Sequence, residues 1–265
     1  MTTPADRNKQ EIVFLGELLE LLGHGGAIVK WQRDELKEVL LANLIPDRVS
    51  AKYTAVFVVD MINDFCRPGG ALYDPRIEAI IQPVVDLLKS AHALGVEKFI
   101  LVQEGHSPDA KEFNQFPAHG VWGTEGAEVI DEITRLPFAQ KFVVFRKNAI
   151  PPIFAREQIM IANRVPALGM TMEQFMRRLD AKLVINIGDC TDLCAREMPM
   201  YQKYWANQFQ RDLRIIVPEN CVATFHLAVE TAKQLGLKSH PAEVMHLLAL
   251  YEMSRHGIEV VKRLV

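Results

Sequence analysis

The segment INIGDCTDLCAREM, residues 185–198, is the most informative stretch for the fold and its chemistry. The apolar run from Leu183 to Ile187 predicts a buried strand, and the residues from 192 onward predict a helix. Cys194 falls in the opening turn of that helix, where backbone N–H groups and the helix dipole favour a thiolate. Cys194 is therefore a candidate nucleophile. The alternative is that it is a small buried core residue, the usual role of a single cysteine beside an apolar strand.

On both sides of this segment, apolar runs alternate with helical patterns from about residue 53. We predict strands at 54–60, 96–103, 141–147, 182–188, 213–218 and near 258–263, and helices at 75–94, 125–134, 171–180, 192–207, 226–236 and 241–255. Runs such as AVFVV and LVINI are apolar on both faces, which is typical of parallel strands covered on both sides. The alternation predicts a doubly wound α/β fold: a mostly parallel six-stranded sheet with helices on both faces.

The first part of the chain has a different pattern. Residues 7–45 predict amphipathic helices, interrupted by the glycine-rich 23–26 and ended by Pro46 and Asp47. We therefore expect an N-terminal helical extension over residues 1–50 and an α/β domain over residues 51–265. The apolar stripe of the extension allows it either to pack in an oligomer or to cover the chain's own sheet or helices, and both alternatives stay open. The stripe comprises Leu15, Leu18, Leu19 and Leu22. As partners we expect further copies of the chain, in a homo-oligomer.

Composition excludes several classes of function. The 265 residues are 49% hydrophobic and 24% charged, as in a globular protein with a substantial core. A net charge of −3 gives no reason to expect nucleic acid or an anionic membrane as a partner. No apolar run approaches the roughly 18 residues of a membrane span, and the N-terminus lacks a signal-peptide pattern. The four cysteines form no disulfide or zinc pattern, so we expect a reducing, cytoplasmic setting. As its partner we expect a small molecule.

Reactive side chains follow the predicted strands. Asp60 ends the run AVFVVD and Lys147 ends the run KFVVFRK, and with Cys194 they lie just past the carboxyl ends of three strands. Open α/β sheets bind and transform ligands at this edge. The stretches 104–124 and 148–170 lack a regular pattern and are expected to border the same edge as long functional loops.

The first of these loops contains a possible metal site. Glu104, His106, Glu112 and His119 supply two carboxylates and two imidazoles, which suit a divalent ion such as Zn, Mn or Fe. The alternative is a solvated polar loop in which these side chains never converge. No strict ligand motif is present, so the spacing leaves both readings open.

Two aromatic residues flank the same region. Phe65 follows Asp60, and Phe116 precedes His119. Their rings could sandwich a flat ligand or could belong to the core, which is the commoner place for phenylalanine.

Four segments together resemble a known family. VVDMINDFCRPGGAL (58–72), the loop over 104–126, Lys147 and GDCTDLC (188–194) occur in the order found in the isochorismatase-like cysteine hydrolases, most closely the nicotinamidases. The resemblance covers about residues 53–236 and implies the isochorismatase-like hydrolase fold. The first 50 residues have no counterpart that we recognise.

The resemblance also implies roles for individual residues. Asp60 matches the catalytic acid and base, Lys147 the catalytic lysine and Cys194 the nucleophile. A non-proline cis peptide is implied between Asp189 and Cys190. In this arrangement the N–H groups of Cys190 and Cys194 form an oxyanion hole.

The metal set of the nicotinamidases can be assigned in the same way. His106 and His119 match the two histidines, and Glu112 lies where some members have an additional glutamate. Glu104 stands where the family typically has aspartate. The resemblance therefore implies a divalent metal and no organic cofactor.

The resemblance implies a cysteine-dependent amidohydrolase that releases ammonia from a small amide, most simply nicotinamide, with Phe65 and Phe116 stacked on its ring. Some positions depart from the pattern: Gly105 replaces an aromatic residue, Ile150 stands where nicotinamidases often have tyrosine, and an insertion extends to about residue 170. Alternatives are a related hydrolase acting on a carbamoyl or ureido amide, maleamate or biuret, and a non-catalytic binding or assembly protein on the same fold.

Overall fold

The computed structural model describes residues 22–161 and 165–265. These residues belong to two compact units, which divide between Lys37 and Glu38. In the first unit, residues 22–34 form one helix. This helix runs through the glycines at 23–26, so the break predicted there is wrong.

Of the predicted apolar stripe, Leu15, Leu18 and Leu19 lie outside the described residues, and Leu22 is exposed.

Residues 38–50 pack with the second unit, although the sequence assigned them to the extension. Strand β1 (Glu38–Val39) pairs in parallel with β11 (Arg263–Leu264), where a helix was predicted. Helices α2 (Leu41–Leu44) and α3 (Arg48–Lys52) follow. Leu41 and Ile45 are buried in the core, which ties this segment to the α/β domain.

The six predicted strands are all present and parallel. They form the order β10-β8-β7-β2-β3-β4 within a nine-stranded sheet. Their bounds are β2 (Thr54–Val59), β3 (Lys98–Glu104), β4 (Phe142–Lys147), β7 (Leu183–Asp189), β8 (Arg214–Pro218) and β10 (Glu259–Val261). From β2 the chain adds β3 and then β4 toward one edge of the sheet, and from β7 it adds β8 and then β10 toward the other.

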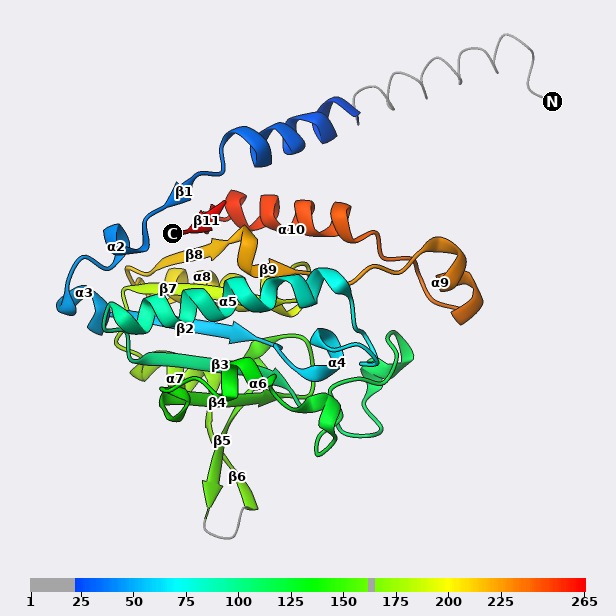
Figure 1. Ribbon diagram of the computed structural model, residues 1–265, viewed down its shortest axis with the longest axis horizontal. Helices are drawn as coiled ribbons and strands as arrows, with labels where there is room; N and C mark the ends of the chain where they lie inside the picture. Colours follow the sequence, from blue (N-terminus) through cyan, green and yellow to red (C-terminus); the bar gives the residue numbers. More distant parts are fainter. Residues whose placement is uncertain (1–21, 162–164) are drawn as a thin grey trace. The chain divides into compact units, whose positions relative to one another are not determined.

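The connecting helices cover both faces of this sheet. Right-handed crossovers that progress in opposite directions place their helices on opposite faces. Helices α5 and α6 thus cover one face, on which Figure 1 shows α5 running along the strands, and α8 and α10 cover the other. The helices are α4 (Asn63–Cys66), α5 (Pro75–Ala93), α6 (Asp131–Thr134), α7 (Met172–Arg178), α8 (Cys194–Gln208), α9 (Val229–Leu235) and α10 (Ala242–Arg255), with short 3-10 turns at η1 (Lys111–Asn114), η2 (Glu125–Ala127), η3 (Ala139–Lys141), η4 (Pro152–Phe154) and η5 (Glu219–Cys221). The predicted doubly wound fold is confirmed.

The sheet extends further than predicted. Strands β5 (Arg156–Ile161) and β6 (Val165–Thr171) form an antiparallel hairpin beside β4, so the expectation of an irregular stretch over 148–170 is wrong. Figure 1 shows this hairpin projecting away from the parallel strands. Pro166 lies in β6, the outermost strand, where a residue without an N–H is tolerated. A short strand, β9 (Val222–Ala223), pairs with the end of β7.

The centre of the sheet is tightly packed where β2 meets β7. Every residue of both strands is buried. At the end of β7, Gly188 has a φ of +114°, and a Cβ there would lie 2.0 Å from the carbonyl oxygen of Val59. Only glycine allows this approach, which brings the carboxyl ends of the two strands together.

None of the helices within residues 22–161 and 165–265 is both long enough and apolar enough to cross a bilayer.

Candidate active site

The site lies at the carboxyl ends of β2 and β7, where the two directions of the sheet diverge. Such a switch point opens a crevice between the loops on either side. Asp60 directly follows β2, Lys147 is the last residue of β4, and Cys194 begins α8 after β7. The Lys147 Nζ lies 2.9 Å from Asp60 Oδ2 and 3.2 Å from Cys194 Sγ, and all three residues are buried. The structure therefore brings together the acid, amine and thiol singled out in the sequence.

Asp60 is held in an uncommon backbone conformation. Its φ is +50°, in the left-handed region that residues other than glycine seldom adopt. The Asp60 N–H donates to the carbonyl of Val102 at 3.0 Å, and the Glu104 N–H donates to Asp60 Oδ1 at 2.6 Å. These bonds to β3 leave Oδ2 facing Lys147.

Burial and charge together set the protonation of the three groups. Burial and the nearby Glu104 raise the pKa of Asp60 to about 6, although Lys147 lowers it. Burial by itself would lower the pKa of Lys147, but Asp60, Cys194 and Glu104 raise it well above its ordinary value. Burial raises the pKa of Cys194 against the opposing effect of Lys147. The resting thiol is thus protonated, and the helix N-terminus alone does not produce the thiolate expected from the sequence.

A second cluster shares Glu104 with these groups. The Glu104 Oε1 accepts hydrogen bonds from Lys147 Nζ at 3.2 Å and from Cys194 Sγ at 3.3 Å. Its Oε2 lies 3.0 Å from His119 Nε2 and 3.4 Å from His106 Nε2. Burial would raise the pKa of Glu104, but Lys147 and the two histidines hold it well below the ordinary value.

This cluster fits a divalent metal ion. Ligand atoms of Glu104, His106 and His119 lie within 4.8 Å of one another and are buried. Glu104 Oε2 and His106 Nε2 have no hydrogen-bond partner within the described part of the chain. Two imidazole nitrogens and a carboxylate oxygen are a donor set that Zn, Mn or Fe accepts.

The outer nitrogens of both histidines are oriented by acceptors. His119 Nδ1 lies 2.6 Å from the carbonyl oxygen of Pro117. His106 Nδ1 lies 3.3 Å from Asn148 Oδ1, which also accepts the Ser107 N–H at 2.9 Å. Because these partners accept, each Nδ1 donates a proton to its partner, and this leaves Nε2 of both rings as the nitrogen available to a metal ion. Asn148 was not predicted as a site residue, although its place directly after Lys147 was a signal.

Glu112 lies at the edge of the cluster. Its Oε2 is 3.6 Å from His106 Nε2, outside the tight group of three ligands. Its Oε1 accepts the backbone N–H of Ile150 at 3.0 Å. Glu112 thus connects the first loop to the segment that follows β4.

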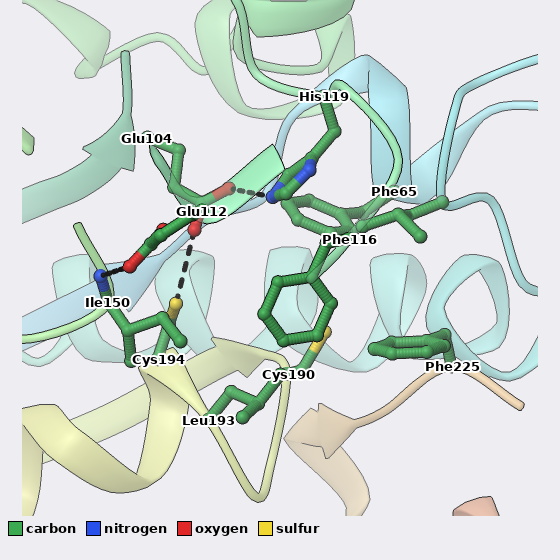
Figure 2. A pocket seen from close by; sticks show the side chains of 11 residues that line it. Phe65, Glu104, Glu112, Phe116, His119, Ile150, Cys190, Leu193, Cys194 and Phe225 are labelled. Atoms are coloured by element: carbon green, nitrogen blue, oxygen red, sulfur yellow. Dashed lines mark hydrogen bonds and ion pairs between the residues drawn. The ribbon is translucent and has the colours of Figure 1, made fainter. Parts of the chain in front are cut away.

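A pocket opens over the sulfur of Cys194 and the cluster. Its wall contains both aromatic residues singled out in the sequence and a third ring, Phe225. The rings of Phe65 and His119 are T-shaped to each other with centroids 5.4 Å apart, and the centroid of Phe116 lies 6.2 Å from that of His119. Figure 2 shows the three phenylalanines on one side of the pocket and Cys194 with Ile150 on the other. The lining residues are Phe65, Leu72, Glu104, Glu112, Phe116, His119, Ile150, Cys190, Leu193, Cys194 and Phe225.

The sequence analysis missed Leu72, Leu193 and Phe225 as lining residues. Phe225 follows β9 at the same edge of the sheet, but this strand has only two residues and leaves no pattern in the sequence from which Phe225 could be predicted.

The turn from β7 to α8 is tightly constrained. The peptide bond between Asp189 and Cys190 is cis. The carbonyl of Cys190 accepts the N–H groups of Leu193 and Ala195, both at 3.0 Å. Cys194 is the first residue of α8, where backbone N–H groups have no partner within the helix.

Comparison with protein families identifies the group to which this site belongs. The family model of the isochorismatase domain matches residues 54–247. The chain belongs to the isochorismatase family. It is therefore an enzyme, a hydrolase, and the predicted resemblance is confirmed. The matched region of this isochorismatase-family chain contains all the site residues described above.

Individual relatives agree with this assignment. The chain is 25% identical to nicotinamidase 1 of Arabidopsis thaliana over 242 residues, covering 87% of this chain and 95% of that protein. N-carbamoylsarcosine amidase of Thermoplasma acidophilum superposes with a TM-score of 0.53 at 23% identity, covering 79% of this chain and 95% of the amidase. Pyrazinamidase of Pyrococcus horikoshii, solved in complex with zinc, gives 0.54 at 21% identity, covering 79% and 99%. These two structures share the fold of this chain.

Proposed function

We propose that this chain is a cysteine-dependent amidohydrolase that converts nicotinamide to nicotinate and ammonia. The observation that supports it most is the contact of one buried ammonium, Lys147, with Asp60 Oδ2 at 2.9 Å and Cys194 Sγ at 3.2 Å. An acid, an amine and a thiol in contact make up the nucleophile, its activating charge and its base. The similarity to a plant nicotinamidase supports the choice of substrate.

Formation of the acyl-enzyme follows from these contacts. Asp60, with a pKa of about 6, accepts the proton of Cys194 as the sulfur attacks the amide carbon. The ammonium of Lys147 stabilises the thiolate as it forms. The N–H groups of Cys190 and Cys194 stabilise the developing oxyanion. Asp60 then gives its proton to the amide nitrogen, the C–N bond breaks, and ammonia leaves a thioester on Cys194.

Hydrolysis of the thioester uses the same base. Asp60 deprotonates a water molecule, which attacks the thioester carbon. The carbon–sulfur bond breaks, nicotinate is released, and the proton held by Asp60 returns to the sulfur of Cys194. Lys147 stays protonated throughout because its pKa lies well above the ordinary value.

Glu104, His106 and His119 would hold a divalent ion, with Glu112 as an additional partner on the side of His106. When bound, this ion supplies a Lewis-acid contact for the ring nitrogen of the substrate. Glu104 Oε2 and His106 Nε2, which are buried and have no hydrogen-bond partner among the described residues, support this assignment.

The pocket wall supports a flat neutral substrate over an anionic one. Phe65, Phe116 and Phe225 offer aromatic surface for a pyridine ring. Among the described lining residues there is no arginine or lysine, while Glu104 and Glu112 contribute negative charge. A substrate with its own carboxylate, such as maleamate or an N-carbamoyl amino acid, would find no basic side chain among these lining residues.

A second candidate is the hydrolysis of a linear carbamoyl or ureido amide. The similarity of the fold to N-carbamoylsarcosine amidase favours it. Ile150 also favours it, because this residue lines the pocket where nicotinamidases often have tyrosine. The β5–β6 hairpin lies in the insertion that follows.

An ammonia-release screen on metal-analysed protein separates these candidates. Nicotinamide, pyrazinamide, N-carbamoyl amides, maleamate and biuret are compared, with Cys194→Ala as the inactive control. We expect kcat/KM for nicotinamide to exceed that for every linear amide by at least about tenfold. One mismatched contact in an apolar pocket lowers kcat/KM by at least about this factor. Turnover of linear amides alone would support the second candidate, and release from none would contradict both.

A further inference from the structure

A hydrogen-bonded network outside the catalytic groups holds the turn that begins α8. Asp192 lies in this turn, between Cys190 and Cys194, and is buried. Its Oδ1 accepts the hydroxyl of Thr224 at 2.6 Å, and its Oδ2 lies 2.7 Å from His240 Nε2. The proposed catalytic steps use none of these three side chains.

His240 connects this turn to the aromatic wall of the pocket. Its Nδ1 lies 2.8 Å from the carbonyl oxygen of Phe225, and its ring stacks on the Phe225 ring with centroids 4.1 Å apart and planes 15° apart. Backbone hydrogen bonds in both directions join His240 to Leu227, at 2.8 and 2.9 Å, and fix the position of the ring.

The partners of His240 determine its protonation. A carbonyl oxygen and a carboxylate both accept hydrogen bonds, so both ring nitrogens must donate, and the side chain is an imidazolium. Burial would lower the pKa of His240, but the carboxylate of Asp192 raises it, in agreement with this geometry. Asp192, whose pKa is lowered by His240 and Thr224 against the effect of burial, is the matching anion.

We propose that His240 is a positioning residue: through Asp192 and Phe225 it fixes both the turn that carries the oxyanion N–H groups and the aromatic wall of the pocket. The catalytic consequence rests on the proposed function. Asp192 stands between the two residues whose N–H groups stabilise the oxyanion, so loosening it displaces both donors. A displacement of about 1 Å in an active site lowers the rate by up to about 100-fold.

Two substitutions separate the two contacts of the ring. His240→Phe keeps an aromatic ring against Phe225 but removes both donors. His240→Gln keeps a donor that reaches Asp192 but removes the ring. We expect His240→Phe to lower kcat on nicotinamide by about tenfold with KM within about twofold of wild type, and His240→Gln to retain kcat within about threefold and raise KM instead.

Two further readouts do not depend on turnover. In the wild-type protein, ¹⁵N NMR of the ring should show both nitrogens of His240 protonated at neutral pH. Hydrogen exchange in peptides covering residues 188–196 should be faster in His240→Phe than in wild type, measured at a temperature at which both proteins are folded. His256→Phe is the matched control, because His256 is exposed beyond the end of α10 and its ring meets that of Tyr204 in a T-shaped arrangement, with centroids 5.8 Å apart. It should match the wild-type protein in all these measurements.

The outcomes are distinguishable. A neutral His240 ring, or unchanged exchange and kcat in His240→Phe, overturns the positioning role even if nicotinamide is hydrolysed. If wild type releases ammonia from no amide while the exchange and NMR results hold, the proposed function fails and the positioning role of His240 stands. If His240→Phe does not fold, Asp192→Asn replaces it, because asparagine keeps the size of the side chain and removes the charge that pairs with the imidazolium.

Discussion

Replacing Lys147 by methionine tests the electrostatic design of the site. Methionine has a similar length and no charge, so Lys147→Met leaves Asp60, Glu104 and Cys194 without the ammonium that lies 2.9 to 3.2 Å from each of them. Removing one partner of a buried ion pair costs about 3–5 kcal/mol. The loss of unfolding free energy in Lys147→Met should be largest at neutral pH, where the carboxylates of Asp60 and Glu104 are both ionised. It should shrink as the pH falls, because protonation then neutralises Asp60.

The same substitution should slow alkylation of Cys194. At 3.2 Å and an effective dielectric constant of 20, the attraction between ammonium and thiolate is about 5 kcal/mol. Even a third of this, roughly 1.7 kcal/mol, lowers the thiolate population by more than tenfold. We therefore expect iodoacetamide to label Cys194 at least about tenfold more slowly at pH 7.5, measured by peptide mass spectrometry.

Lys141→Met is the matched control. Lys141 pairs with Glu97 at 2.6 Å, but both side chains are partly or largely exposed, and such a pair contributes under about 1 kcal/mol. In this control, the free energy of unfolding and the rate of Cys194 alkylation should equal those of wild type. If Lys147→Met also matches wild type in both measurements, the electrostatic role of Lys147 is refuted.

Further predictions concern the nucleophile, the metal and the network around His240. Cys194→Ala should abolish ammonia release and leave the protein folded by circular dichroism, because the attacking atom is gone and the side chain stays small. His119→Ala should lose zinc binding in calorimetric titration before it unfolds, and Asn148→Ala should weaken zinc binding by about 10- to 100-fold through the loss of its contact with His106. Asp192→Asn should lose about 1–3 kcal/mol of stability to urea. The stability difference between wild type and Asp192→Asn should be largest between pH 3.8 and 6.5, where Asp192 is ionised and His240 is protonated. Below this window the difference shrinks as Asp192 is protonated at its lowered pKa, and above it the difference shrinks as His240 loses its proton at its raised pKa.

Controls and contrary outcomes follow from the same contacts. Cys221→Ala removes another buried thiol and should retain activity; wild-type turnover in the Cys194 variant would exclude that thiol as the nucleophile. His256→Ala should keep zinc affinity unchanged, whereas full zinc occupancy in the His119 variant would mean that the ligand set is wrong. A stability difference for Asp192→Asn that does not vary with pH would contradict the ion pair with His240.

The strands of the sheet were predictable because their environment is simple. β2 and β7 are buried along their whole length, so they occur in the sequence as continuous apolar runs. The β5–β6 hairpin was not predictable by the same reasoning. It is held mainly by its own pairing, and Pro166 is compatible with a strand only at the edge of a sheet, which the sequence does not reveal. The two residues of β9 are too short for any periodicity.

The site was predictable where it follows strand ends. Asp60, Lys147 and Cys194 converge because parallel strands bring their carboxyl ends to one edge. Phe225 and His240 could not be found in this way, since their contacts with the site depend on how a distant segment folds back over the turn. The homo-oligomer, the cytoplasmic setting, and the lack of nucleic-acid partners and organic cofactors stay predictions.

The most direct test of the central claim is to trap the acyl-enzyme. Metal-loaded protein is mixed with nicotinamide, quenched with acid during turnover and analysed by intact and peptide mass spectrometry. We predict a mass gain of one nicotinoyl group on the peptide that contains Cys194, and no such gain in Cys194→Ala. Ammonia release without any acylated cysteine, or acylation of a residue other than Cys194, would contradict the claim.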